Sequence, residues 1–178
     1  YEVEVKVAAD LSGVADRLDE LGATQTGDVV QVDTYYDAPH RDFAETDEAL
    51  RVRRETSDDD TEARITYKWP LVDDDSKTRE EYETGVDDGE TADTIFERLG
   101  FSPAATVEKD RQFYHYDGYT ITLDAVEDVG EFVEVETETD EAGVEAAREG
   151  AYEVLRKLGL NPDKQIRTSY LGMLLEDA

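Results

Sequence analysis

The first segment of the chain places charged side chains on one face of a predicted strand. Residues 2–7 alternate charged side chains (Glu2, Glu4, Lys6) with valines. A strand sends alternate side chains to opposite faces, so two carboxylates and an ammonium group share one face. Faces that carry both signs of charge at a fixed spacing suggest a site for a metal ion and a polyanion. The same spacing recurs later in the chain, at Arg51 and Arg53, Lys109 and Arg111, and Glu134 and Glu136.

The carboxylates are candidate metal ligands. The chain has no cysteine, and its two histidines, His40 and His115, lie in no metal-ligand spacing, so we interpret both as ordinary loop or strand residues. Hard oxygen ligands favour magnesium or manganese over zinc, and magnesium commonly joins one or two carboxylates to substrate phosphates. The carboxylates at strand positions that could face an interior are Glu2, Glu4, Asp124, Glu134 and Glu136.

The basic residues are candidate anion ligands. The chain has only six lysines, and Lys6, Lys68 and Lys109 lie in predicted strands. If selection has removed lysine from the surface, those that remain are enriched where an ammonium group is required. Arginine can grip phosphate with two parallel hydrogen bonds, each worth about 1.5–3 kcal/mol, so several together could hold a triphosphate. The competing interpretation is that charges alternating along a strand face solvent, which is a strong alternative for the carboxylates.

Acidic residues dominate the composition, with 47 Asp and Glu against 18 Lys and Arg and a net charge of −29. Such a surface repels nucleic acid and anionic membranes, so neither is expected as a partner. The charge is spread along the chain among many β-branched and aromatic residues, which argues against a disordered acidic segment. This excess of acidic over basic residues is typical of proteins from salt-accumulating halophiles.

A halophilic protein should depend on salt for its stability. We expect partial unfolding in dilute buffer and recovery in concentrated potassium chloride, because the Debye length of about 3 Å in molar salt screens the repulsion between surface carboxylates. Thermal melting across a potassium chloride series would test this. A melting temperature that does not change with salt would remove the halophilic interpretation.

The elements that position these residues can be read from periodicity. At 178 residues the chain fits one domain, residues 1–178, with a sizeable core. There is no signal peptide and no run of about 18 apolar residues, so we expect a cytoplasmic protein.

Amphipathic helices are predicted over 10–21, 91–99 and 140–158, each ending in a Leu-Gly-apolar sequence that favours a left-handed glycine cap.

Most of the remaining chain alternates as strands do, and Asp117-Gly118 is a strong hairpin turn. Eight strands with short connections and three helices predict an α+β fold, an eight-stranded antiparallel β-barrel braced by amphipathic helices. Such a barrel is filled by side chains or holds one small ligand. A homodimer is compatible with the sequence, although nothing in it marks an interface. The predicted strands are 1–8, 29–36, 47–55, 62–70, 78–86, 105–115, 119–126 and 131–139.

These motifs, in this order, resemble the CYTH superfamily (triphosphate tunnel metalloenzymes) and, within it, the class IV adenylate cyclases. The opening Glu2-Val3-Glu4-Val5-Lys6 fits the family's Glu-x-Glu-x-Lys signature, and the similarity covers essentially the whole chain. Ser169-Tyr170-Leu171 resembles the terminal helix of the cyclases. The other matching segments are Gln31–Asp37, Ala49–Arg53, Thr66–Lys68, Lys77–Glu81, Val107–Arg111, Leu123-Asp124 and Gly130–Glu136.

The resemblance implies a tunnel of eight antiparallel strands, with Mg²⁺ or Mn²⁺ held by Glu2, Glu4, Asp124, Glu134 and Glu136. It implies that a triphosphate is bound by Lys6, Arg51, Arg53, Lys68, Arg79, Lys109 and Arg111. A further basic group often comes from the C-terminal region, where Lys164 and Arg167 are the candidates. The residues expected to act in the chemistry are Lys6, Arg51, Arg53, Glu134 and Glu136.

The leading functional hypothesis is a class IV adenylate cyclase-like enzyme that makes cyclic AMP and pyrophosphate from ATP. The nearest alternative is a triphosphatase acting on tripolyphosphate, thiamine triphosphate or a nucleotide in the same tunnel. A third hypothesis is a non-catalytic module that binds polyphosphate or nucleotide. Loss of some of the expected metal-binding carboxylates would favour this hypothesis. Among the aromatic residues, Tyr35, Tyr36, Tyr67 and Trp69 could stack on a base, although packing on strands is commoner.

Overall fold

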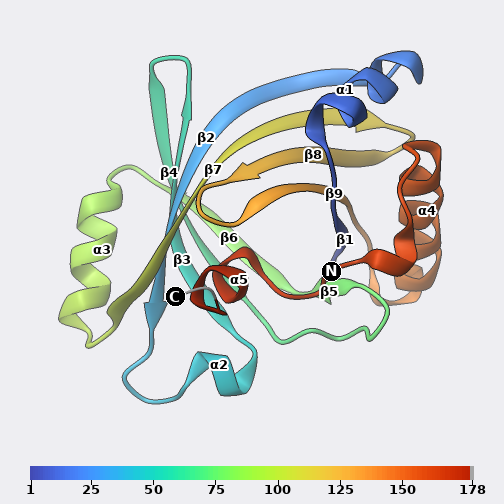
Figure 1. The fold of residues 1–178 in the computed structure, drawn as a ribbon. Helices are drawn as coiled ribbons and strands as arrows, with labels where there is room; N and C mark the ends of the chain where they lie inside the picture. Colours follow the sequence, from blue (N-terminus) through green and yellow to red (C-terminus); the bar gives the residue numbers. More distant parts are fainter. Residues whose placement is uncertain (177–178) are drawn as a thin grey trace.

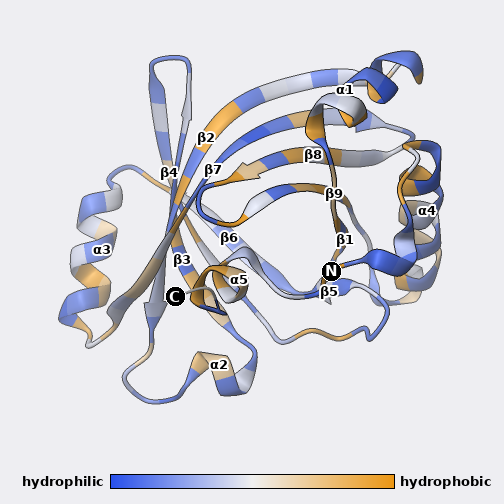
Figure 2. Ribbon diagram, in the orientation of Figure 1, coloured by the Kyte–Doolittle hydropathy of each residue, from blue (hydrophilic) through white to orange (hydrophobic). Residues whose placement is uncertain are grey.

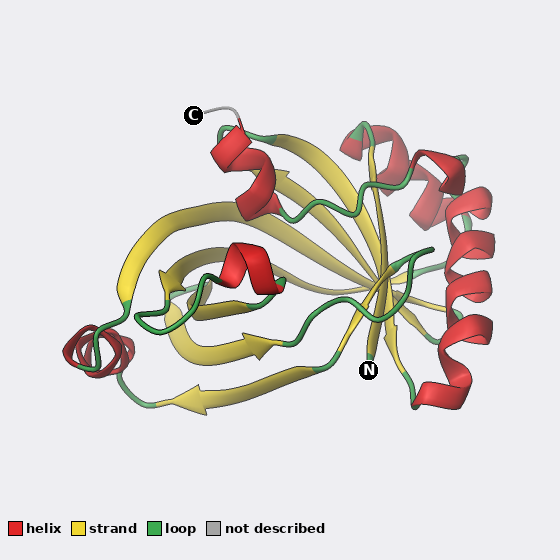
Figure 3. Cartoon of the chain, turned by 90° about the horizontal axis from the view of Figure 1, so that it is seen from below, coloured by secondary structure: helices red, strands yellow, loops and turns green. Residues whose placement is uncertain are grey.

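The computed structural model describes residues 1–176, which form one strongly curved antiparallel sheet with helices on its outer surface (Figures 1 and 3). The strands are β1 (Glu2–Ala8), β2 (Thr24–Asp37), β3 (Ala49–Ser57), β4 (Asp60–Lys68), β5 (Lys77–Arg79), β6 (Glu81–Val86), β7 (Ser102–Tyr116), β8 (Tyr119–Val126) and β9 (Gly130–Glu138). The helices are α1 (Leu11–Glu20), α2 (Phe43–Thr46), α3 (Gly89–Arg98), α4 (Val144–Lys157) and α5 (Tyr170–Glu176).

The sheet closes almost completely into a barrel. Its strand order is β5-β1-β9-β8-β7-β2-β3-β4-β6, and only Glu80 separates the two edge strands β5 and β6. Arg79 lies opposite Glu2 of β1, and Glu81 lies opposite Lys68 of β4. The predicted α+β barrel is therefore confirmed with nine strands in the described chain instead of eight. The predicted strand 78–86 divides because its first part pairs with one edge of the sheet and its second part with the other.

The register gives each strand one face toward the barrel interior and one toward the helices. In β1, Val3, Val5 and Val7 are buried beneath the outer layer, while Glu2 and Glu4 line the interior. Hydrophobic and hydrophilic residues alternate along β2 in the same way (Figure 2). Because most of the cavity lining is polar, two of the three apolar clusters lie between the sheet and its outer helices.

Helices α1 and α4 cover β1, β8 and β9, where Leu18 and Leu155 belong to the largest buried apolar cluster. Helix α3 packs over β3 through a second cluster that includes Val52 and Ala92. The predicted helix ends are confirmed: Gly22, Gly100 and Gly159 have positive φ, and the following residue donates its backbone N–H to the preceding turn. The predicted helix 140–158 begins instead with a 3₁₀ turn at Glu141–Gly143.

Two strands are longer than predicted. β2 and β7 pair from Thr24 to Asp37, with register shifts near Gly27 and Tyr36. The first residues of β2 are polar and exposed on both faces, so their sequence shows no alternation that could reveal the strand. No helix among residues 1–176 has the length and apolar character needed to cross a membrane.

Candidate active site

A cavity of about 820 Å³ lies in the barrel interior. Side chains from β1 to β7, β9 and α5 line it, which is the consequence of inward-facing positions repeating at every second residue of each strand. Both signs of charge are present throughout. The site residues expected from the sequence that line this cavity are Glu2, Glu4, Arg51, Arg53, Lys68, Lys109, Arg111, Glu134 and Glu136.

Three carboxylates gather at one wall. One oxygen from each of Glu2, Glu4 and Glu136 lies within 4.8 Å of the others, and Glu4 is directly opposite Glu136 across the β1–β9 pair. Burial and the Glu136 charge raise the pKa of Glu2 well above its usual value. Burial and the charges of Glu4 and Glu134 raise the pKa of Glu136 to about 7. A divalent cation would relieve this repulsion, so the oxygen-only donor set fits Mg²⁺ or Mn²⁺.

Glu134 lies between the carboxylate cluster and the basic residues. Arg111 donates to it at 3.1 Å, and Lys6 lies opposite it in the β1–β9 register. Burial alone would raise the pKa of Glu134, but Arg111 and Lys77 outweigh burial and hold that pKa well below its usual value. Glu134 therefore stays ionised and joins the two halves of the site.

Asp124 lies behind the cavity wall and not in it. It is fully buried, accepts two hydrogen bonds from Arg111 at 2.6 and 2.7 Å, and accepts a third from the Tyr170 hydroxyl at 2.6 Å. Its carboxylate oxygens are thus engaged by other side chains. Among the expected metal ligands, the structure brings Glu2, Glu4 and Glu136 together and places Asp124 beneath Arg111.

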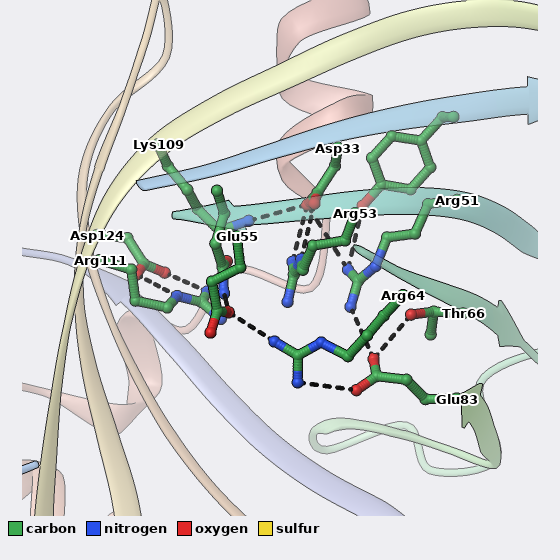
Figure 4. A network of polar contacts seen from close by, with 12 residues as sticks. Asp33, Arg51, Arg53, Glu55, Arg64, Thr66, Glu83, Lys109, Arg111 and Asp124 are labelled. Carbon is green, nitrogen blue, oxygen red and sulfur yellow. Dashed lines mark hydrogen bonds and ion pairs between the residues drawn. The ribbon is translucent and has the colours of Figure 1, made fainter. Parts of the chain in front are cut away.

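Asp33 organises the basic wall of the cavity (Figure 4). Arg53 donates two hydrogen bonds to the two carboxylate oxygens of Asp33, at 2.7 and 2.8 Å. The Lys109 ammonium donates to one of these oxygens at 3.2 Å, and the Arg51 guanidinium lies 3.9 Å from the same oxygen. Burial would raise the pKa of Asp33, but Lys109 and Arg51 outweigh it and hold the pKa well below its usual value. Burial lowers the pKa of Lys109 to about 7 despite the neighbouring Asp33. The wall thus carries a net positive charge that an anion could neutralise.

Lys6 is fully buried at the edge of this basic region and is not part of the cavity lining. Its ammonium group donates to the Thr168 carbonyl at 2.5 Å and lies 4.3 Å from the centre of the Tyr170 ring. Burial and the nearby Lys77 lower the pKa of Lys6 to about 7. Lys77, in contrast, lines the cavity and forms an ion pair with Glu4 at 3.0 Å.

The other expected basic ligands have different positions. Lys68 lines the cavity and pairs with Glu81 at 3.0 Å. Arg79 is not in the cavity lining and donates to the carbonyl oxygens of Asp47 and Trp69. Lys164 and Arg167 also lie outside the lining, and Arg167 donates to the carbonyls of residues 73 and 76.

Several lining residues were not expected from the sequence. Arg64 donates to Glu55 at 2.7 Å and to Glu83 at 3.4 Å, and Glu83 also accepts from Thr66 (Figure 4). Glu55 follows Arg53 by two residues, so strand alternation could have identified it. The sequence could not separate Lys77 from Arg79, because both fall on the same face of one strand. The other lining residues that were not named as site residues include Gln31, Tyr35, Glu81, Phe113 and Tyr170.

Most aromatic residues considered for base stacking lie outside the cavity lining. Tyr36 packs on Phe96 of α3, and Tyr67 packs on Trp69. Tyr35 lines the cavity, and its hydroxyl accepts a hydrogen bond from Arg51 at 3.4 Å.

Comparisons with known proteins agree with this architecture. The CYTH domain model matches residues 1–170. A protein of Methanocaldococcus jannaschii that bears the name "Putative adenylate cyclase MJ0240" is 38% identical over 174 residues, which cover 97% of each chain. The solved structure of the PH1819 protein from Pyrococcus horikoshii is 38% identical, with complete coverage of both chains and a TM-score of 0.94.

A more distant structure shares the fold. HpAC1 of Hippeastrum, an adenylyl cyclase by name that is described as having a dominant triphosphatase activity, is 18% identical. The structural alignment covers 99% of this chain and 96% of the HpAC1 chain, with a TM-score of 0.74. The match of the CYTH model over nearly the whole chain and the 38% identity across 97% of a relative show that this chain belongs to the CYTH domain family.

Proposed function

We propose that this protein is a divalent-metal-dependent enzyme that acts on a triphosphate inside the barrel. The observation that supports the proposal is one cavity that holds both a three-carboxylate cluster and a wall of buried arginines and lysines. Such a combination fits a ligand that is itself a cation and a polyanion together, as a metal triphosphate is. Membership of the CYTH family supports the same substrate class.

The cation would be held by Glu2, Glu4 and Glu136, and when bound it would neutralise phosphate charge and activate the attacking oxygen. The other steps fall to side chains of the barrel. Arg53 and Arg111 present guanidinium groups that their buried carboxylate partners already orient, so they can grip phosphate oxygens with little reorganisation. Lys109, held beside Arg53 by Asp33, adds positive charge where the leaving phosphate develops negative charge.

Two reactions are compatible with this site. Cyclisation of ATP, in which the ribose 3′-oxygen attacks the α-phosphorus, is favoured by the name of the 38% identical archaeal relative. Hydrolysis of the terminal phosphate is the second candidate. It is favoured by the position of Tyr36, Tyr67 and Trp69, three of the four aromatic residues considered for base stacking, outside the cavity.

A product assay in molar potassium chloride would separate these reactions. Purified protein would receive ATP or tripolyphosphate with magnesium or manganese, and products would be resolved by chromatography. Cyclic AMP with equimolar pyrophosphate would identify a cyclase, and orthophosphate without cyclic AMP would identify a triphosphatase. No product from either substrate, in folded protein that still binds ATP, would overturn the enzymatic proposal in favour of a binding module.

The charge of Lys109 predicts a pH dependence. Its pKa of about 7 means that it loses its charge as pH rises through neutrality, so the affinity for metal-free tripolyphosphate should fall between pH 6 and pH 8. Lys109→Arg should flatten part of this decline, because arginine stays protonated throughout. Isothermal titration calorimetry at several pH values would measure both. An identical decline in the wild type and the variant would contradict the role given to Lys109.

A further inference from the structure

Lys77 places an ammonium group directly beside the carboxylate cluster. In the sheet, Glu4 lies between Glu136 of β9 and Lys77 of β5, and all three side chains line the cavity. The Lys77 ammonium lies 3.0 Å from one carboxylate oxygen of Glu4, and both side chains are largely buried. Burial would lower the pKa of Lys77, but Glu4 and Glu134 outweigh burial and hold that pKa above its usual value. The cluster therefore has a positive charge of its own beside it.

The contact between Lys77 and Glu4 does not satisfy the Glu4 carboxylate. The two groups form an ion pair that is not aligned for a hydrogen bond, and the buried Glu4 oxygen that faces Lys77 accepts no hydrogen bond from the described residues. A buried carboxylate oxygen without a hydrogen bond is costly and can accept a further ligand. Because oxygens of Glu2 and Glu136 lie within 4.8 Å of one of Glu4, a divalent cation is the ligand that fits.

The backbone of Lys77 is held in place from outside the barrel. The turn before it is fixed at Asp73, whose carboxylate accepts hydrogen bonds from Arg148 of α4 at 3.1 and 3.2 Å and from the Ser76 hydroxyl at 2.6 Å. Arg167 donates to the carbonyl oxygens of Asp73 and Ser76 at 2.6 and 3.2 Å. Since this turn is fixed and lysine has a flexible four-carbon stem, the ammonium group is the part of Lys77 that can move.

Glu4 cannot bind the Lys77 ammonium and a divalent cation equally well. A magnesium ion lies about 2.0–2.1 Å from its oxygen ligands. An ion on Glu4 would therefore lie within about 5 Å of an ammonium group that kept its 3.0 Å contact, and like charges at that distance repel. Lys77 also lies close enough to Lys6 to lower the pKa of that residue. Its ammonium thus lies between the carboxylate cluster and the basic side of the cavity.

We propose that Lys77 is a built-in counter-ion that exchanges partners when substrate binds. In the metal-free protein it neutralises Glu4 and competes with metal for that carboxylate. When a divalent cation is held by Glu2, Glu4 and Glu136, the Lys77 ammonium turns from Glu4 to an oxygen of the phosphate on that cation. Metal binding thereby frees a phosphate ligand, which favours binding of metal and triphosphate together. This inference rests on the proposed binding of a metal triphosphate in the barrel.

Two affinities, measured by calorimetry in molar potassium chloride at pH 8, test the proposal in Lys77→Met. Without the competing ammonium group, Mn²⁺ alone should bind the metal-free variant at least about tenfold more tightly than the wild type. Tripolyphosphate should bind the Mn²⁺-saturated variant at least about tenfold more weakly than the Mn²⁺-saturated wild type, because one phosphate ligand is missing. A role of Lys77 in folding alone would weaken both affinities. Mn²⁺ binding that is unchanged or weaker in Lys77→Met, or tripolyphosphate binding that is not weakened, would overturn the proposal.

Two further variants control the experiment. Lys77→Gln keeps a polar side chain in the cavity and should show the same two opposite changes, so the test does not depend on how well Lys77→Met folds. Lys164→Met makes the same change in net charge at an exposed position outside the cavity lining and should bind both ligands as the wild type does. If tripolyphosphate does not bind the Mn²⁺-saturated wild type, the proposed function fails, whereas equal Mn²⁺ affinities of the wild type and Lys77→Met overturn this inference alone.

Discussion

Replacing Glu136 by Gln should abolish turnover of ATP and tripolyphosphate. It should also weaken Mn²⁺ binding by at least about 100-fold, because removal of a residue that only supports a metal ligand already costs up to about 100-fold in metal affinity. The amide offers a weaker, uncharged oxygen where the carboxylate cluster requires charge. We expect the variant to keep the wild-type fold and stability. Because burial and Glu4 raise the pKa of Glu136 to about 7, the folded protein disfavours its charged form. The free energy of unfolding of the metal-free variant at pH 8 should therefore equal or exceed that of the wild type.

Calorimetric titration of metal-free protein with manganese, together with denaturant unfolding, would measure both effects. Glu131→Gln is the matched control, since Glu131 lies on the same strand but is exposed and outside the cavity lining. Full activity or unchanged Mn²⁺ affinity in Glu136→Gln would remove the assignment of Glu136 as a metal ligand. A large loss of stability would show that its charge is needed for folding instead.

Replacing Asp33 by Asn should lower the free energy of unfolding by about 3–5 kcal/mol, the range found when one partner of a buried ion pair is removed. Asp33 has no exposed surface and is shared by Arg53, Lys109 and Arg51. Without its charge these cations remain buried and repel one another. Tripolyphosphate binding should weaken as well, because the Arg53 guanidinium loses the partner that orients it.

The pH dependence of this effect has a definite sign. The folded-state pKa of Asp33 is well below its usual value, so its contribution is fully present above the unfolded-state pKa of about 3.9 and is lost as pH falls through the folded-state pKa. The Asp33 contribution to the difference between the wild type and Asp33→Asn should therefore shrink in strong acid, whereas nearer neutrality the difference also follows the charge of Lys109, whose pKa Asp33 raises. A difference that grows as the pH falls below about 3.9 would contradict the ionised state assigned to Asp33.

An exposed ion pair provides the control for Asp33. Glu20 accepts from Arg17 at 2.9 Å, and both side chains are about half exposed or more. Glu20→Gln should change the free energy of unfolding by no more than about 1 kcal/mol. Urea denaturation in molar potassium chloride would measure both variants. Equal effects of Glu20→Gln and Asp33→Asn on the free energy of unfolding would show that burial does not increase the contribution of the Asp33 ion pairs to stability.

The local pattern of the chain determined most of the fold. Alternation along strands placed Glu2 and Glu4 in the interior and Val3 and Val5 beneath the helices, because side-chain direction in a strand depends only on the parity of position. The Leu-Gly-apolar sequences likewise located the ends of three helices. The order of the motifs then identified the family, which the match of the CYTH model confirmed.

The tertiary structure decided which charged residues share the site. Parity cannot distinguish Lys77 from Arg79, yet pairing with β1 puts Lys77 beside Glu4, and the turn to β6 sends Arg79 toward Asp47. Parity also cannot show that Asp124 is engaged by Arg111. These outcomes depend on contacts between residues that are distant in sequence, which no local pattern encodes.

The same reason applies to the docking of α5 on the barrel. Tyr170 reaches Lys6 across a sequence separation that only the closed barrel and the path of the C-terminal segment can bridge. By itself, the sequence determined that charges of both signs line a barrel. The closure of the sheet at Glu80 and the docking of α5 decided where those charges meet, because both are long-range contacts that form only when the whole chain is folded.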